Sequence, residues 1–240
     1  MRLLSKFFAV SLLTLAIACG GGGDSAPGPL SHHFDDMFVA DVGMDQKTQM
    51  LQAQNDWSLA KAENAKAEAD VHAADSQISN AKNDVKAAQL QVDNANNDKK
   101  TADATKDNNN INAATAKQHN AQSAKKASEA RVKYLESYKN WLGAQFRYTQ
   151  ENMYWREAQY ELAKSTLAQK SGKSPRDQQY DWYPKQEQDR NSRAQSAKGK
   201  VDSKKSDAKS KRDAWLSAQS TSDKENGRTS AFADPMAGVN

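Results

Sequence analysis

Apolar side chains recur every seven residues over the first long stretch of the chain. The bulky positions of this repeat are Met50, Trp57, Asn64, Val71, Ile78, Val85 and Val92. Three residues after each stands an alanine, in the series Ala53, Ala60, Ala67, Ala74, Ala81, Ala88 and Ala95, and Ala102 continues the series. Bulky a positions with an all-alanine d column predict a coiled coil. Asn64, polar at an a position, is expected to set helix register or partner choice.

An alanine column makes a close but weak seam. Small side chains bring helix axes toward the short end of the usual separation of about 8–10 Å. Each buried methyl contributes only about 0.8 kcal/mol, against several for a large side chain. Stability must therefore depend on the length of the seam and on a denser region elsewhere.

The denser region lies between residues 134 and 167. Tyr134, Trp141, Tyr148, Trp155 and Leu162 again step by seven, and neighbouring apolar residues widen the stripe. A stripe this wide predicts contact with two neighbouring helices. The aromatic residues that we expect in the core are Trp57, Tyr134, Trp141, Tyr148, Trp155 and Trp215. A cofactor or carbohydrate groove built on these rings is the alternative, although helical spacing favours packing.

A polar segment at residues 103–112 separates the two regions. It contains Asp107, Asn108, Asn109 and Asn110, the only residues with turn chemistry in about ninety positions. A reversal here would fold residues 46–170 into an antiparallel hairpin, with Trp57 beside the Trp155 region and Val92 beside Ala124. One continuous helix is the alternative, because the seven-residue phase survives the segment unchanged.

A third helix is predicted over residues 185–224. Gly172, Pro175 and Pro184 interrupt the helical pattern, which makes residues 171–184 a loop. Running back along the aromatic helix, the third helix would bring Trp215 near Tyr138 and Trp141. Residues 225–240 are expected to be disordered. The predicted fold class is all-α: a long antiparallel coiled-coil hairpin with a third helix packed on its base and disordered termini.

Composition fits slender helices better than a globule. Alanine accounts for 38 of the 240 residues, whereas Leu, Ile, Val and Phe together number 32. So few large apolar residues would indicate a disordered chain if the net charge were high. The 34 basic and 30 acidic residues nearly balance, however, so the net charge is low. A net charge of +4 argues against a polyanion-binding protein as a whole. The export signal in residues 1–18 also argues against nucleic acid as a partner.

Residues 1–18 have the features of an export signal. Arg2 and Lys6 precede an apolar run that ends at Ala18. The run is too short to remain as a membrane-spanning helix. The only cysteine of the chain, Cys19, follows directly.

The box Ala16, Ile17, Ala18 and Cys19 resembles the signal of bacterial lipoproteins, which signal peptidase II cleaves. Ala16 stands where that family usually has leucine. The resemblance implies that Cys19 carries acyl chains, palmitate among them, and holds the protein on a membrane, where several chains anchor more stably than one. Gly20 in place of aspartate implies the outer membrane, with the protein facing the periplasm. Residues 19–45 would then be a flexible tether. An ordinary signal peptide with an incidental cysteine is the alternative.

The sequence shows no constellation typical of catalysis. His32, His33, Asp35 and Asp36 are the one cluster of metal-ligand types, but nothing near them fixes a coordination geometry. We find no phosphate-binding loop, no Ser-His-acid set and no acid pair in an apolar setting. We therefore predict no metal, no cofactor and no enzyme activity.

Two features are candidates for binding. Tyr180, Trp182 and Tyr183 place three rings in the loop, where they would either stack on a glycan or peptide or cap the end of the bundle. A basic run from Lys198 to Arg212 could touch an anionic envelope polymer, although interleaved aspartates favour a solvated helix face.

These patterns favour a non-enzymatic envelope lipoprotein that acts as an elongated scaffold or spacer. Cys19 and the alanine column resemble, in architecture only, the alanine-zipper outer-membrane lipoproteins related to murein lipoprotein. That family self-associates, and murein lipoprotein joins peptidoglycan through a terminal lysine. This chain ends in Asn240, so no such covalent link is predicted. Self-association, an envelope protein and a non-covalent peptidoglycan contact are the expected partnerships. One alternative is a periplasmic holdase chaperone or adaptor that binds clients between helical arms. An efflux-type adaptor hairpin is another, although such hairpins are flanked by β-rich domains and this sequence has no alternating strand pattern.

Overall fold

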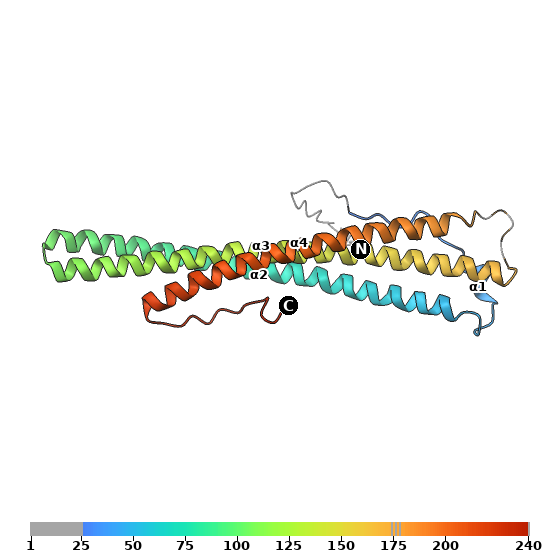
Figure 1. The fold of residues 1–240 in the computed structure, drawn as a ribbon, viewed down its shortest axis with the longest axis horizontal. Coiled ribbons are helices and arrows are strands. Elements are labelled where there is room, and N and C mark those ends of the chain that lie inside the picture. The colour runs from blue at the N-terminus through green and yellow to red at the C-terminus, as the bar shows by residue number, and fades with distance from the viewer. Residues whose placement is uncertain (1–25, 174, 176, 178, 240) are drawn as a thin grey trace, which may run out of the picture.

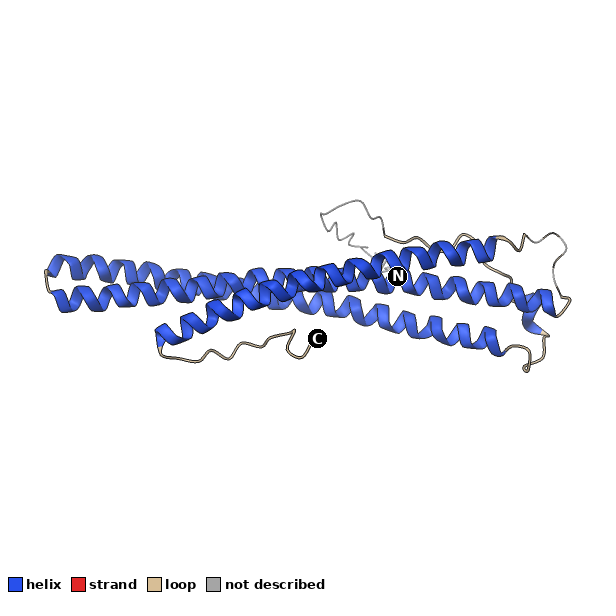
Figure 2. Cartoon of the chain, in the orientation of Figure 1, coloured by secondary structure: helices blue, strands red, loops and turns tan. Residues whose placement is uncertain are grey.

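The chain folds into a long, narrow assembly of helices, seen in a computed structural model that describes residues 26–239 except 174, 176 and 178 (Figure 1). A short helix α1 (Met37–Ala40) precedes three long ones, α2 (Thr48–Thr105), α3 (Asn108–Lys170) and α4 (Trp182–Asn226). Every regular element of the described residues is a helix (Figure 2), which confirms the all-α class. The predicted signal peptide and Cys19 lie outside the described residues.

The polar segment forms a tight reversal, so α2 and α3 are an antiparallel hairpin and not one continuous helix (Figure 1). Lys106 ends α2 with a left-handed backbone at φ 56°. The Asp107 carboxylate then caps α3 by accepting a hydrogen bond from the Asn109 amide at 2.8 Å. Asp107 thus supplies an N-cap that satisfies one of the otherwise unpaired amides of the first helical turn.

The alanine column forms the seam as expected. Its buried members are Ala60, Ala74, Ala81, Ala88, Ala95 and Ala102. Pairing runs outward from the turn: Val92 packs with Ala121, and the ring of Trp57 stacks on that of Tyr160 at 5.8 Å. Both partners lie within about one and a half helical turns of the predicted ones. At the polar a position, Thr149 donates a hydrogen bond to the Asn64 side chain at 3.2 Å.

The three long helices form an open layer with α3 in the middle. Helix α3 packs against both α2 and α4, whereas α2 and α4 do not pack together anywhere in the described chain. They diverge toward the end of the molecule that carries α1, which we call the base (Figure 1). Trp215 of α4 stacks on Tyr134 of α3 at 5.2 Å, one heptad from the expected neighbour Trp141. The wide stripe of α3 therefore serves two neighbours, as predicted.

The expected core aromatics divide into two groups. Tyr134, Trp141 and Trp215 are buried, whereas Trp57, Tyr148 and Trp155 are only partly buried. The second group lies nearer the base, where the separation of α2 and α4 leaves α3 less covered.

Two segments that were expected to lack structure instead lie against the helices. In the C-terminal tail Met236 is 1 % exposed, and in the N-terminal tether Phe34 and Val39 are 3 % and 4 % exposed. Both segments are almost devoid of helix, as their glycines and prolines indicate. They are nevertheless placed, because an open layer leaves apolar surface beside α3 that a single chain segment can cover.

Candidate functional site

The N-terminal strap, residues 28–42, is fastened to the base of the helical layer. Helix α4 contacts its backbone through two side chains one turn apart. Gln186 accepts hydrogen bonds from the amides of Ser31 and His32 at 3.1 and 3.0 Å and donates one to the His32 carbonyl at 3.0 Å. Arg190 donates to the Gly28 carbonyl at 3.0 Å. These contacts hold backbone groups of an extended segment that has no strand to pair with.

Helix α3 holds the same strap through a buried ion pair. The side chains of Glu161 and Lys164 meet at 2.9 Å, and both residues are more than 95 % buried. Glu161 accepts a hydrogen bond from the Phe34 amide at 2.6 Å. The Lys164 ammonium donates to the Phe34 carbonyl and to the Asp36 carboxylate, each at 2.8 Å. Charges this deeply buried are tolerated only when paired and hydrogen-bonded, and here both conditions are met.

The protonation of Lys164 follows from these partners. Burial alone would lower the pKa of its ammonium, but the hydrogen bonds and negative charges of Asp36 and Glu161 outweigh burial and raise the pKa. Lys164 therefore stays charged at every physiological pH, and the fastening of the strap persists.

An apolar cluster closes the base beneath this ion pair. Its buried members are Phe34, Val39, Val42, Met50, Leu167, Ala168 and Tyr183. The rings of Phe34 and Tyr183 meet edge to face at 5.8 Å, and the Tyr183 hydroxyl donates to the His33 carbonyl at 3.3 Å. Strap, α2, α3 and α4 thus share one cluster at this end of the molecule.

The three aromatics predicted for the loop have different placements, and Trp182 and Tyr183 are the first residues of α4, which begins earlier than expected. Tyr183 is 1 % exposed, and Tyr180 lies partly buried with its ring 6.2 Å from that of Phe34, so these two cap the bundle end. Trp182 is 38 % exposed and stacks on His32 at 4.2 Å. Of the expected partner-contact residues, Trp182 is therefore the one with an accessible ring.

A shallow groove of roughly 340 Å³ runs beside Trp182, between the strap and the start of α4. Its lining residues are Ser31, His32, Trp182, Lys185, Gln186, Asp189 and Arg190. A partly exposed ring bordered by polar and charged side chains suits a sugar or a polar peptide better than an apolar ligand.

The cluster of His and Asp residues in the strap serves packing and pairing. His32 stacks on Trp182, and Asp36 is bound by Lys164. In the part of the chain that the structure describes, no three His, Cys, Asp or Glu side chains are grouped to hold a metal ion.

The residues that fasten the strap were not found from sequence. Glu161 and Lys164 stand one turn apart within the partly apolar stretch before Leu167, which was the one available signal. Gln186 and Arg190 gave none, because their partners are backbone groups about 155–160 residues away in the chain.

None of the described helices is both long and apolar enough to cross a bilayer. A scan against models of known protein families, a search of curated proteins and a search of solved structures each find no match to this chain.

Proposed function

We propose that this protein is a non-enzymatic lipoprotein of the bacterial cell envelope, a helical spacer tethered through Cys19 to the outer membrane and facing the periplasm. The observation that supports it best is the fastened strap. A tether loaded at Cys19 would pass its force to Gly28, then through Arg190, Gln186 and the buried Glu161–Lys164 pair to the helices.

The dimensions suit a spacer. Helix α3 has 63 residues and is therefore roughly 95 Å long at 1.5 Å per residue. Its partners α2 and α4 have 58 and 45 residues and run alongside it. Length is what a spacer needs, because it acts by reach and by the surfaces at its ends.

The groove beside Trp182 supports a non-covalent contact with envelope glycan, that is, with peptidoglycan. Trp182 offers a ring face, and Asp189 and Lys185 offer hydrogen bonds beside it. An envelope protein and a second copy of the chain are the other partners consistent with exposed helix faces.

The anchor is tested by replacing the lipidated residue. In cells fed labelled palmitate, Cys19→Ser is expected to abolish the label and to move the protein out of the membrane fraction, whereas the control Ser25→Ala should keep both. Label retained on Cys19→Ser, or an unchanged membrane fraction, would remove the anchor from the account.

A periplasmic holdase is the second candidate, and the separation of α2 and α4 near the base favours it. Trp155 and Tyr148 of α3 remain partly exposed there and could contact a client. A holdase would protect an aggregating test protein at near-stoichiometric ratios, and Trp155→Ala would reduce that protection. A spacer would leave the aggregation rate unchanged.

A further inference from the structure

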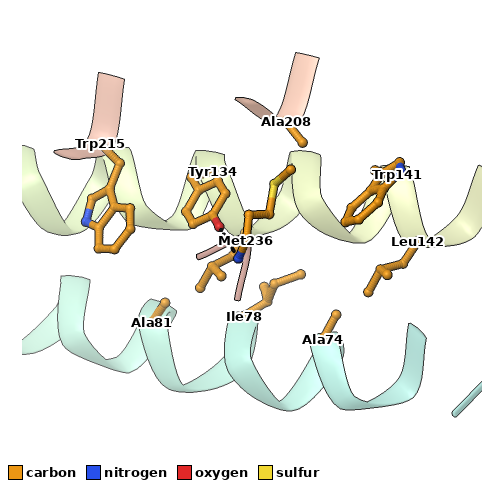
Figure 3. Close-up of a cluster of buried hydrophobic side chains, with 10 residues drawn as sticks. Ala74, Ile78, Ala81, Tyr134, Trp141, Leu142, Ala208, Trp215 and Met236 are labelled. Carbon is orange, nitrogen blue, oxygen red and sulfur yellow. Dashed lines mark hydrogen bonds between the residues drawn. The ribbon is translucent and has the colours of Figure 1, made fainter. Parts of the chain in front are cut away.

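The C-terminal segment, residues 230–239, occupies a groove over the middle of α3. Met236 lies among side chains of all three long helices, with Ile78 and Ala81 from α2, Tyr134 from α3 and Trp215 from α4 (Figure 3). Helices α2 and α4 do not pack together in the described chain. The segment therefore lies between two helices whose backbones do not approach each other closely.

A carboxylate fixes the segment in register. Asp234 accepts a hydrogen bond from the Tyr134 hydroxyl on one oxygen and from Arg212 Nε on the other, each at 2.5 Å. The Met236 amide donates to the Tyr134 hydroxyl at 3.2 Å. Burial would raise the pKa of Asp234, but the hydrogen bonds from Tyr134, Arg212 and Met236 outweigh it and the pKa is lowered. The site thus selects an ionised carboxylate two residues before a linear apolar side chain.

The connection between α4 and this segment is exposed. Helix α4 ends at Asn226 and is capped by Gly227, whose φ of 62° suits glycine, and residues 228, 229, 231, 232 and 233 are exposed. Ser230 is the exception, because its amide and hydroxyl donate to Asp223 at 3.0 and 2.8 Å. Phe232, although 40 % exposed, has its ring 4.2 Å from the Arg131 guanidinium. The buried contacts of the segment are therefore concentrated in 234–236, and a linker on another path would lose only the contacts of Ser230 and Phe232.

We propose that this groove is a peptide-binding site for an Asp-Pro-Met segment and that it takes the C-terminal segment of a second copy in place of its own, so that two copies exchange tails. Exchange replaces each contact by an identical one, so its free-energy cost is small. Charge complementarity between Arg212 and Asp234 is kept in the exchanged pair. Because α2 and α4 each pack on α3 directly, the tail can leave while both helices keep their contacts with α3.

Two full-length variants test whether the site works between copies. A groove variant, Tyr134→Phe with Arg212→Gln, keeps an intact tail, and a tail variant, Asp234→Asn with Met236→Ala, keeps an intact groove. Each alone should sediment as a monomer, and an equimolar mixture should form a 1:1 complex. Wild-type chain should dimerise with rising concentration, and the matched control Thr229→Ala should behave as wild type. Circular dichroism establishes that both variants remain helical.

A labelled peptide of residues 227–240 measures the site directly. Fluorescence anisotropy should show at least tenfold tighter binding to the tail variant than to wild type, whose own tail competes. The same peptide carrying Asp234→Asn should bind at least tenfold more weakly. Absence of saturable binding, or equal binding of the two peptides, overturns the peptide site. Binding of the peptide without any 1:1 complex in the mixed variants overturns exchange between copies.

Discussion

Glu161 and Lys164 place opposite charges where the base is closed to water. A buried ion pair often contributes little net stability, but removing one partner leaves the other charge buried and uncompensated. Here the pair also binds the backbone of Phe34 on both its amide and its carbonyl. Its role in this molecule is therefore to specify where the strap lies, more than to add stability.

Replacing Lys164 by alanine should be costly for this reason. We expect Lys164→Ala to lower the free energy of unfolding by about 3 kcal/mol or more, in the range for breaking a buried pair. Urea unfolding followed by circular dichroism measures the change. Lys170→Ala, which alters an exposed lysine of the same helix, should change it by less than about 0.5 kcal/mol. Equal effects of the two substitutions would show that the pair is not buried in solution.

Glu157, one turn before Glu161, is expected to oppose folding at neutral pH. Burial raises the pKa of its carboxyl and the charge of Glu161 adds to this, while His33, Lys61 and Arg190 partly offset it. A raised folded-state pKa contributes stability below the unfolded value, and that contribution is lost as pH rises through the folded pKa.

Glu157→Gln should therefore raise the urea midpoint at pH 7 but leave it nearly unchanged near pH 3, where the wild-type carboxyl is protonated in both states. The control Glu63→Gln, at an exposed position of α2, should show no such pH-dependent gain. A gain that is the same at both pH values would exclude ionisation as its cause.

At the scale of elements, the long helices and their pairing could be predicted because their signals are local and periodic. The alanine column gave the seam, and the turn chemistry of Asp107 gave the reversal. The strap and the tail could not be placed, because many of their contacts join residues about 100 or more positions apart, such as Tyr134 with Asp234, and show no periodic pattern. Glycine and proline correctly indicated the lack of helix there, but lack of helix does not mean lack of a fixed position.

The turn between α2 and α3 carries a residue that is poorly suited to it. Lys106 adopts a left-handed backbone, which costs an L-residue about 1 kcal/mol and costs glycine almost nothing. Lys106→Gly should therefore raise stability by up to about 1 kcal/mol. Lys100→Gly, inside α2, should lower it by a similar amount. Thermal melting of both variants decides this, and a loss of stability in each would mean that the hairpin turn lies elsewhere.

At the scale of the whole molecule, the arrangement of three long helices in one layer makes the protein long and narrow. Helix α3 is the shared element, and the two non-helical segments cover parts of it that α2 and α4 leave open. The order of the chain places the N-terminal strap at the base, where a tether at Cys19 would attach the rod. The far end, formed by the α2–α3 turn, is left to extend away from that attachment (Figure 1).

The reach of this rod is the central claim, and small-angle X-ray scattering of residues 19–240 carrying Cys19→Ser tests it most directly. Extrapolated to zero concentration, the maximum dimension should be close to the roughly 95 Å length of α3 at 1.5 Å per residue. A continuous helix over residues 48–170 would instead give roughly 185 Å. A compact 240-residue globule would have a radius of gyration of only about 18 Å. Either of these last two results would contradict the hairpin spacer described above.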